Sequence, residues 1–530
     1  MSSHTSSGDV QTISMASSKP ESCKLAHGSP CVPCLELEIF DREAQSILER
    51  LSEDRRKILA QINRHHDPFI QRLPLELASQ IFAFCLPLRD PDTDPCYNPL
   101  FWSRSKGRYI KPFNIVLGAI CQAWRQVAWL TPKLWSTLLI SLHRYDNGVY
   151  KELVMEWLMR SAQIPLDVSL WNKGLAESLP LTEKYVNIWK PLIDIVNGCS
   201  SRWRSFSIYA PDLVLAYIIG DSRGTSRLEY LKVDPGPWVL EPPSYADERS
   251  LHRFSLTNAI PMPSELVSIA MPLRSIDIDW SSLITIEIGK LYLNESLVLL
   301  RWTPRLTRCK LNDLQGGQDE NLPSPTPTHH HTLQELDIRD QWGQQIAEKL
   351  LGFLILPSLI SLLYDSEYNS LENVAAFLDR SGCRLTTLHD AHGVFHKLLV
   401  LAPHLQALEW LQYPGYIGRG KYPPNQWLPN LCEILLHSGP VFWDLVFDLI
   451  MSCPPKAFTI HVEDLESRDE DFLIDEESAR RFQDLIEKGY DIKITCRLWA
   501  RGEDEDRDLL AWSEESRMSQ SRVSGLNQVS

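Results

Sequence analysis

The sequence lacks the signatures of several common enzyme classes. It contains no Gly-x-x-x-x-Gly-Lys-Ser/Thr loop, no His-Glu-x-x-His pair and no Gly-x-Gly-x-x-Gly run after a strand. Asp90, Asp92 and Asp94 alternate as in a calcium loop, but the Gly and the distal Glu that such a loop needs are missing. We therefore expect no catalytic residues, no enzymatic activity and no cofactor.

Basic charge is also scarce. The chain has 53 Lys and Arg against 68 Asp and Glu, which gives a formal net charge of −15. Nucleic acids and anionic lipids are held mainly by clustered Lys and Arg. The charge balance therefore argues against a nucleic-acid partner.

Long hydrophobic runs are missing as well. The longest apolar stretch, Lys349 to Leu363, is broken by Gly352 and Pro357, and Met1 to Pro20 is rich in Ser and Thr without any apolar run. A membrane-spanning helix needs about 20 apolar residues and a secretory signal needs an apolar segment near the N-terminus. We expect neither a signal peptide nor a membrane span, and no membrane partner.

The twelve cysteines are scattered, which is typical of reduced thiols in an intracellular protein of the cytoplasm or nucleus. Cys23, His27, Cys31 and Cys34 have the spacing of zinc ligands, but the second closely spaced pair of a usual zinc site is absent. We therefore expect no metal. His329 to His331 lie in a Pro- and Thr-rich segment and are expected to be exposed linker.

The residues that are present indicate a folded protein of several units. Apolar residues make up 44% of the positions and charged residues 23%, which is typical of a globular protein. The length of 530 residues suits two to four domains. Residues 1–34 and 500–530 are rich in small or charged residues and are expected to be disordered tails.

Residues 35–67 are expected to form one amphipathic helix. Its apolar positions step by three, four or seven residues with charges between them; they are Leu37, Phe40, Ala44, Ile47, Leu51, Ile58 and Ile62. The helix either packs on its own domain or associates with itself as a coiled coil. Asp54 interrupts one position of the coiled-coil seam.

Residues 68–145 are expected to form a small helical domain. Pro74 suits the first turn of a helix in which Leu77, Ile81 and Phe84 share a face, and Pro87 ends it. A loop over 88–111 follows. Asn114 is a plausible cap for a second helix with an apolar face of Leu117, Ile120, Cys121, Trp124 and Val127, and Thr131-Pro132 starts a third, short helix. Connecting helices are expected over 146–202.

Three elements in this domain occur in a particular order. They are Leu73-Pro74-Leu75-Glu76-Leu77 with Ile81-Phe82, then Cys121-Gln122-Ala123-Trp124-Arg125, then Pro132-Lys133-Leu134-Trp135. This order resembles the F-box, a three-helix motif of Skp/cullin/F-box ubiquitin ligases. With the preceding helix it is similar to the large F-box family of mushroom-forming (basidiomycete) fungi. In the compact family pattern the second helix follows the first almost directly, whereas here residues 88–111 intervene.

The resemblance implies a function. A member of this family would be a substrate-recognition adaptor that binds the Skp-type adaptor and, through it, the cullin ligase core. It further implies that Leu73, Pro74, Leu77, Ile81 and Trp124 contact the Skp-type adaptor or hold the helices that do. The alternative is a helical core that needs these residues only for packing.

Residues 203–499 contain a second, repeated pattern, apolar-x-x-apolar-x-apolar. Its instances are Trp203/Phe206/Ile208, Leu228/Leu231/Val233, Leu251/Phe254/Leu256, Leu273/Ile276/Ile278, Leu306/Cys309/Leu311, Leu333/Leu336/Ile338, Leu359/Leu362/Tyr364 and Leu405/Leu408/Trp410, with a degraded one at Leu385/Leu388. Helical segments lie between several of them, such as Ser296 to Trp302 and Glu372 to Arg380. A strand and a helical return repeated every 20 to 30 residues are typical of leucine-rich repeats.

The expected fold class is therefore α/β, with an N-terminal helical F-box-like domain followed by an irregular leucine-rich-repeat-like solenoid. A doubly wound α/β sheet is the alternative architecture. We expect the repeats to bind a target protein whose identity the sequence does not give. The alternative function is a leucine-rich-repeat interaction scaffold with no ligase role.

Overall fold

The structure is a computed structural model of the chain. It describes residues 31–66, 72–86, 103–105, 108–110, 112–142, 148–171, 183–220, 228–234, 254–256, 263–268, 273–315, 327–340, 345–366, 371–390, 401, 404–414, 428–437, 443–452, 457–464, 473–498, 507–515 and 518. The chain divides into two units, 1–92 with 97–131 and 93–96 with 132–530. We call them unit 1 and unit 2. None of the described helices is both long and apolar enough to cross a membrane.

Unit 1 is helical. Its elements are α1 (Val32–His66), α3 (Leu75–Phe84), β1 (Ser103–Ser105), β2 (Arg108–Ile110), α4 (Phe113–Ile120) and α5 (Gln122–Leu130). Strands β1 and β2 pair antiparallel, so part of the expected loop over 88–111 forms a small hairpin. The rest of that loop, residues 88–102, 106, 107 and 111, lies outside the described residues.

Helix α1 is a single helix of 35 residues. Its side chains are exposed or half-buried from Cys31 to Ile62, and none of them is buried. Among the described residues, none covers the apolar face of α1, so packing of this face on its own domain is not seen there. The N-terminal tail predicted before it lies outside the described residues up to Pro30.

Helices α3 and α5 pack together through a few specific contacts. Ala78 and Phe82 are the buried residues of α3, and the Phe82 ring lies 4.9 Å from the Trp124 ring. The buried hydroxyl of Thr131, just after α5, lies 2.9 Å from the Ser79 hydroxyl and 2.7 Å from the Val127 carbonyl oxygen. These contacts fix α5 against α3.

Two sequence expectations for α4 and α5 need correction. Helix α4 begins one residue before Asn114, because Pro112, with φ of −53°, already occupies the cap position. Asn114 instead lies inside the helix and is buried. Ile120 is 51% exposed rather than facing the core, and Trp124 is half-buried rather than central to it.

Unit 2 is a mixed α/β unit built on a mostly parallel sheet. Fifteen strands among the described residues form this sheet in chain order: β3 (Thr137–Ser141), β4 (Leu166–Trp171), β5 (Trp203–Tyr209), β6 (Tyr230–Asp234), β8 (Glu265–Ser268), β10 (Thr285–Gly289), β11 (Arg308–Asn312), β13 (Glu335–Asp340), β15 (Ser361–Ser366), β16 (Thr387–Asp390), β17 (Trp410–Pro414), β18 (Glu433–His437), β19 (Ala457–Asp464), β20 (Asp491–Leu498) and β21 (Arg507–Asp508). Only β21 is antiparallel to its neighbour.

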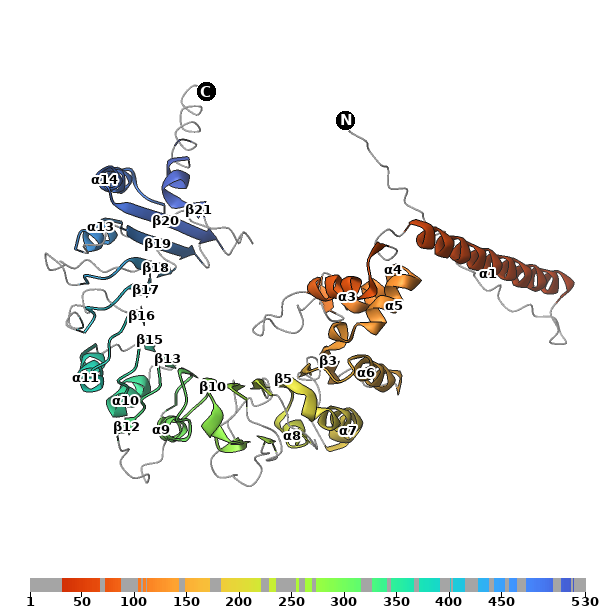
Figure 1. Ribbon diagram of the computed structural model, residues 1–530, viewed down its shortest axis with the longest axis horizontal. Coiled ribbons are helices and arrows are strands. Elements are labelled where there is room, and N and C mark those ends of the chain that lie inside the picture. The colour runs from red at the N-terminus through yellow and green to blue at the C-terminus, as the bar shows by residue number, and fades with distance from the viewer. Residues whose placement is uncertain are drawn as a thin grey trace. The chain divides into compact units, whose positions relative to one another are not determined.

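Helices follow many of these strands and lie along one side of the sheet (Figure 1). The α-helices are α6 (Gly148–Arg160), α7 (Glu183–Gly198), α8 (Asp212–Leu215), α9 (Leu293–Trp302), α10 (Ile346–Phe353), α11 (Leu371–Ser381), α13 (Trp443–Ser452) and α14 (Glu476–Glu487). Short 3-10 helices are η2 (Pro132–Trp135), η4 (Ser200–Arg202), η7 (Leu273–Ser275) and η8 (Trp280–Ser282). Helices α9 and α11 confirm the two helical segments expected between the triplets.

The core of unit 2 lies between the sheet and these helices. One residue from each of fourteen neighbouring strands stands in the same register row, and all fourteen are buried: Leu138, Val168, Phe206, Leu231, Leu266, Ile286, Cys309, Leu336, Leu362, Leu388, Leu411, Ile434, Ile460 and Ile494. Side chains alternate between the faces of a strand, so the residues on either side point away from the core.

The sheet differs from the sequence expectation in where it starts. Strands β3 and β4 extend it into the ranges expected to be the helical domain and the connecting helices. Trp135/Leu138/Ile140 has the same spacing as the later triplets, so the signal was present. Its proximity to the Thr131-Pro132 helix start favoured a helix instead.

Two of the expected triplets do not enter this sheet. Phe254 and Ile276 lie on β7 (Phe254–Ser255) and β9 (Ile276–Asp277), which pair only with each other. Strands β8 and β10 take their places in the sheet. Both triplets are apolar because Phe254 and Ile276 are buried, but they are buried outside the main sheet.

Two segments expected to be loop or tail are ordered. Strand β12 (Thr328–His329) pairs with β14 (Leu354–Ile355), and His330 is buried rather than exposed linker. Residues 507–515 add β21 and a helical turn, where the buried Ser513 hydroxyl accepts a hydrogen bond from the Ile474 N–H at 3.0 Å. The other residues of the expected C-terminal tail, apart from Met518, lie outside the described residues.

Candidate protein-interaction surfaces

Helix α3 has a buried side and an exposed apolar side. Pro74, Leu77, Ile81 and Phe84 follow one another at helical spacing; Leu77 is 45% exposed, Ile81 38% and Phe84 83%. We call these four residues the α3 stripe. Ala78 and Phe82, which hold α3 to the rest of unit 1, lie off this stripe. An exposed apolar row beside a small core is typical of a docking surface.

Of the five residues predicted to bind the partner, three lie on the α3 stripe and two do not. Pro74 is the exposed cap of α3, with an extended backbone at φ −54° and ψ 147°, and Leu77 and Ile81 lie beside it on the stripe. Leu73 precedes the cap and is half-buried. Trp124 is not on the stripe: its ring packs on Phe82, so it holds α5 against α3.

Phe84 belongs to the stripe although it was not predicted as a partner-binding residue. Its place on the shared helix face was visible in the sequence, but the predicted partner-binding residues came from the F-box resemblance, whose matched elements do not include Phe84. Helices α4 and α5 add further exposed apolar side chains, Ile120, Trp129 and Leu130. Arg125 on α5 donates a hydrogen bond to the Gly118 carbonyl oxygen of α4 at 2.7 Å.

Unit 2 offers a second surface, the face of the sheet opposite the core. We call it the exposed sheet face. Along the middle strands its residues are mostly polar or charged: Thr285 and Glu287, Arg308 and Lys310, Glu335 and Asp337, Ser361 and Leu363, Thr387 and His389. Neighbouring strands are about 4.8 Å apart, so side chains in one row reach those on the next strand.

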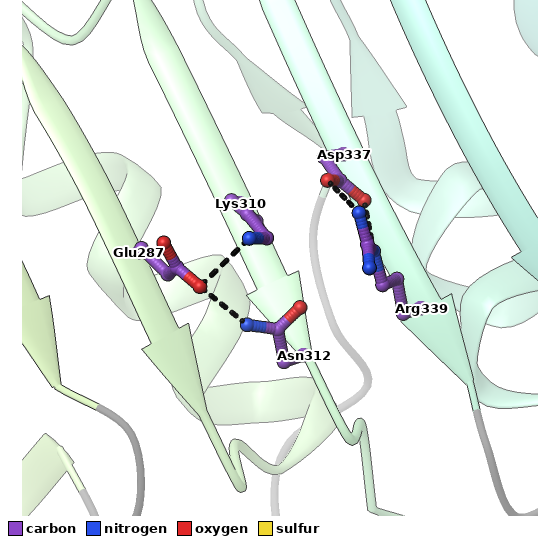
Figure 2. Close-up of polar contacts among 5 residues, drawn as sticks. All are labelled: Glu287, Lys310, Asn312, Asp337 and Arg339. Carbon is purple, nitrogen blue, oxygen red and sulfur yellow. Dashed lines mark hydrogen bonds and ion pairs between the residues drawn. The ribbon is translucent and has the colours of Figure 1, made fainter. Parts of the chain in front are cut away.

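Charged and polar side chains of this face form two separate groups of contacts on three neighbouring strands, as Figure 2 shows. The Lys310 ammonium lies 2.8 Å from a Glu287 carboxylate oxygen, and the Asn312 amide donates to the same oxygen at 3.0 Å. Arg339 donates two hydrogen bonds of 3.1 Å to Asp337. Exposed ion pairs contribute only about 0–1 kcal/mol each, so these contacts orient the side chains more than they stabilise the fold.

A shallow hollow of about 300 Å³ lies on this part of the exposed sheet face. Four carboxylates and two cations are among its lining residues: Glu265, Glu287, Glu335, Asp337, Arg308 and Lys310. Arg308 and Glu335 pair at 2.9 Å. Cys309 also borders the hollow, but burial raises the pKa of its thiol to about 12, so it stays protonated at neutral pH.

A third feature is an aromatic cluster farther along the same face. The Trp410 ring lies 4.3 Å from the His389 ring, and its indole N–H donates to Glu433 at 3.0 Å. His461 lies 3.4 Å from the same Glu433 oxygen and 2.7 Å from the Thr495 hydroxyl. We call these five residues the Trp410 cluster.

Trp410 corrects a sequence expectation. It was expected to be the third apolar residue of a buried triplet, but it is half-buried on the exposed sheet face, and Leu411 takes the core position. In the neighbouring triplets the second residue stands in the core row, but here the row falls on Leu411, three residues after Leu408, and an odd shift reverses the face. Alternation along the strand was the signal that could have found it.

The described residues give little support for a metal site or a cysteine nucleophile. No group of three potential metal ligands occurs among the described residues; Cys23 and His27 lie outside them. A second hollow of about 520 Å³ borders Cys383 and His404. Burial raises the pKa of the Cys383 thiol to about 11, which does not suit a nucleophile.

One enzyme-like spacing in the sequence has no supporting context. Gly220 to Gly224 reads Gly-Asp-Ser-Arg-Gly, the spacing of a nucleophile elbow. Such an elbow joins a strand to a helix, whereas the residues before Gly220 are a turn that follows helix α8. Ser222 itself lies outside the described residues.

Comparison with known proteins assigns the chain to no family. No family model matches the chain, and no curated protein matches it.

Proposed function

We propose that the chain is a substrate-recognition adaptor of a Skp/cullin/F-box ubiquitin ligase, in which the α3 stripe binds the Skp-type adaptor. The observation that carries the proposal is the division of α3 into a side buried on Trp124 and an exposed apolar row that starts at Pro74. A unit this small cannot bury all of its apolar surface by itself. Docking the stripe in a groove of a partner would bury it.

In the same proposal, unit 2 is an irregular leucine-rich-repeat-like solenoid that binds the target protein. Three features support this: the strands follow chain order, the helices lie on one side, and one apolar residue of each of the fourteen parallel strands stands in a common row. A doubly wound sheet instead changes strand order and carries helices on both faces. The exposed sheet face is the surface left for a target.

The Trp410 cluster is the proposed anchor for that target. Partly exposed Trp side chains are enriched among the residues that dominate protein interfaces. Trp410 is also held in place by its contacts to His389 and Glu433, so little ordering entropy is lost when a partner covers it.

A pull-down with a purified recombinant Skp-type adaptor tests the ligase role. The full chain should retain the Skp-type adaptor, and Ile81→Asp should abolish retention by placing a carboxylate in the contact. Ile486→Asp is the matched control, because Ile486 is exposed to a similar extent, 42%, on a helix of unit 2. Failure of the parent chain to bind, or equal loss with both variants, would contradict the proposal.

The second candidate is a protein-interaction scaffold with no ligase role. It is favoured by the exposed sheet face, whose charged contacts and Trp410 cluster lie wholly within unit 2 and need nothing from unit 1. Under this alternative Trp410→Ala still weakens target binding, but no Skp-type adaptor co-purifies with the parent chain.

A further inference from the structure

Helix α1 carries an apolar stripe that no described residue covers. Written as heptads abcdefg with Leu37 at a, the a positions through Ile58 are Leu37, Ala44, Leu51 and Ile58, and the d positions through Gln61 are Phe40, Ile47, Asp54 and Gln61. The large apolar members of this seam are all exposed: Leu37, Phe40, Ile47, Leu51 and Ile58. At 1.5 Å per residue the helix is about 50 Å long, long enough for a two-helix coiled coil.

The charges of α1 are segregated along its length. Residues 32–49 contain five acidic residues and one Arg, a net charge of −4, and residues 50–62 contain four basic and two acidic residues, a net charge of +2. A helix with opposite charge at its two ends attracts a second copy that runs in the opposite direction.

A parallel pair is disfavoured by its contacts. In a parallel dimer each d residue faces itself, so Asp54 would meet Asp54 of the second copy inside the seam. The flanking g and e positions would bring Arg50 against Arg55 and Glu36 against Asp41. Each of these is a contact between like charges.

An antiparallel pair removes these conflicts. In one antiparallel alignment, each a residue faces the d residue of the second copy for which the two residue numbers sum to 98. Leu51 then meets Ile47 of the second copy, Ile58 meets Phe40, and Asp54 lies beside the small side chain of Ala44. The stripe is then buried in its central layers.

The flanking charges match in the same alignment. Asp41 meets Arg55 of the second copy, Glu43 meets Lys57, and symmetry doubles both pairs. Lys57 already pairs with Asp54 of its own helix at 3.7 Å, but both side chains are exposed, so the exchange costs little. The one like-charge contact left at the flanks is Arg50 with its own copy at the two-fold axis.

We propose that α1 joins two copies of this chain as an antiparallel coiled coil centred near Glu49. This proposal is independent of the ligase role, because it uses none of the residues of the α3 stripe.

Sedimentation analysis of the full chain at micromolar concentration tests it with charge-reversed variants. The parent should sediment as a dimer of 2 × 60.8 = 121.6 kDa. Asp41→Arg with Glu43→Lys should weaken dimerisation roughly tenfold or more, because four attractive contacts become repulsive. Arg55→Asp with Lys57→Glu should do the same. Mixing the two variants should restore a dimer, since each supplies the charges that the other needs.

Helix content measured by circular dichroism controls for folding, because all four positions are exposed. A monomeric parent would overturn the proposal and assign the stripe to another partner. Tighter dimerisation of the Asp41→Arg/Glu43→Lys variant would mean a parallel pair, in which the basic side chain introduced at position 41 meets Glu36. Absence of association in the mixture would show that this seam is not the interface.

Discussion

Replacing Leu336 by Ala should lower the free energy of unfolding of unit 2 by about 3 kcal/mol. Leu336 on β13 is 1% exposed. Its register neighbours on the two adjacent strands, Cys309 on β11 and Leu362 on β15, are also buried. Truncating a buried Leu costs about 2–5 kcal/mol, through lost transfer free energy and the cavity that remains. The two neighbouring strands are held by backbone hydrogen bonds and cannot close that cavity, so a value near the middle of the range is expected.

The measurement is urea unfolding followed by tryptophan fluorescence, with Leu363→Ala as the matched control. Leu363 is the residue after the core position on β15, so it lies on the exposed sheet face and is half-buried. Its truncation should cost less than about 1 kcal/mol. A Leu336→Ala protein within about 0.5 kcal/mol of the parent, or a Leu363→Ala protein that is the less stable of the two, would refute the assigned faces of the sheet.

Three further predictions concern unit 1, a buried histidine and the exposed sheet face. Phe82→Ala should destabilise unit 1 by about 3–5 kcal/mol and the half-buried Trp124→Ala by about 2 kcal/mol, measured by thermal melts; equal melting of Trp124→Ala and parent would refute the α3–α5 contact. Burial lowers the pKa of His330, whose ring nitrogen Nε2 lies 2.8 Å from the Thr303 carbonyl oxygen. As the pH falls, the unfolded chain therefore binds a proton at His330 before the folded chain does. The contribution of His330 to the free energy of unfolding is complete above about pH 6.5 and decreases as the pH drops toward the lowered folded-state pKa. His330→Asn should flatten this dependence of the unfolding free energy on pH, and an unchanged dependence would contradict the prediction. Trp410→Ala should reduce capture of a crosslinked target at least about tenfold without changing the urea midpoint; unchanged capture would remove Trp410 as the anchor.

Much of the α/β architecture could be predicted from the sequence because a repeated apolar spacing reports burial directly. Leu333/Leu336/Ile338 and Leu359/Leu362/Tyr364 are buried where the spacing placed them. The apolar spacing does not give the strand where a short strand lies next to helix signals, as at β3, or where an apolar triplet is buried outside the main sheet, as at Ile276.

The interaction surfaces were less predictable, for a physical reason. Alternation within a strand tells which face a residue occupies, but which residues meet across strands depends on loops of unequal length. The approach of Lys310 to Glu287, and of Trp410 to Glu433, therefore follows only from the register of the strands. On α3 the helical period alone placed Leu77 and Ile81 together, because one helix needs no partner to set its spacing.

Hydrogen exchange of the full chain, with and without a purified Skp-type adaptor, tests the central claim most directly. If the α3 stripe binds the Skp-type adaptor, the backbone amides of Leu75–Phe84 should exchange more slowly when the Skp-type adaptor is added. The exchange rates of the amides in β10 and β11 should stay unchanged. No protection of α3 with the Skp-type adaptor in excess, or protection confined to the exposed sheet face, would contradict the account.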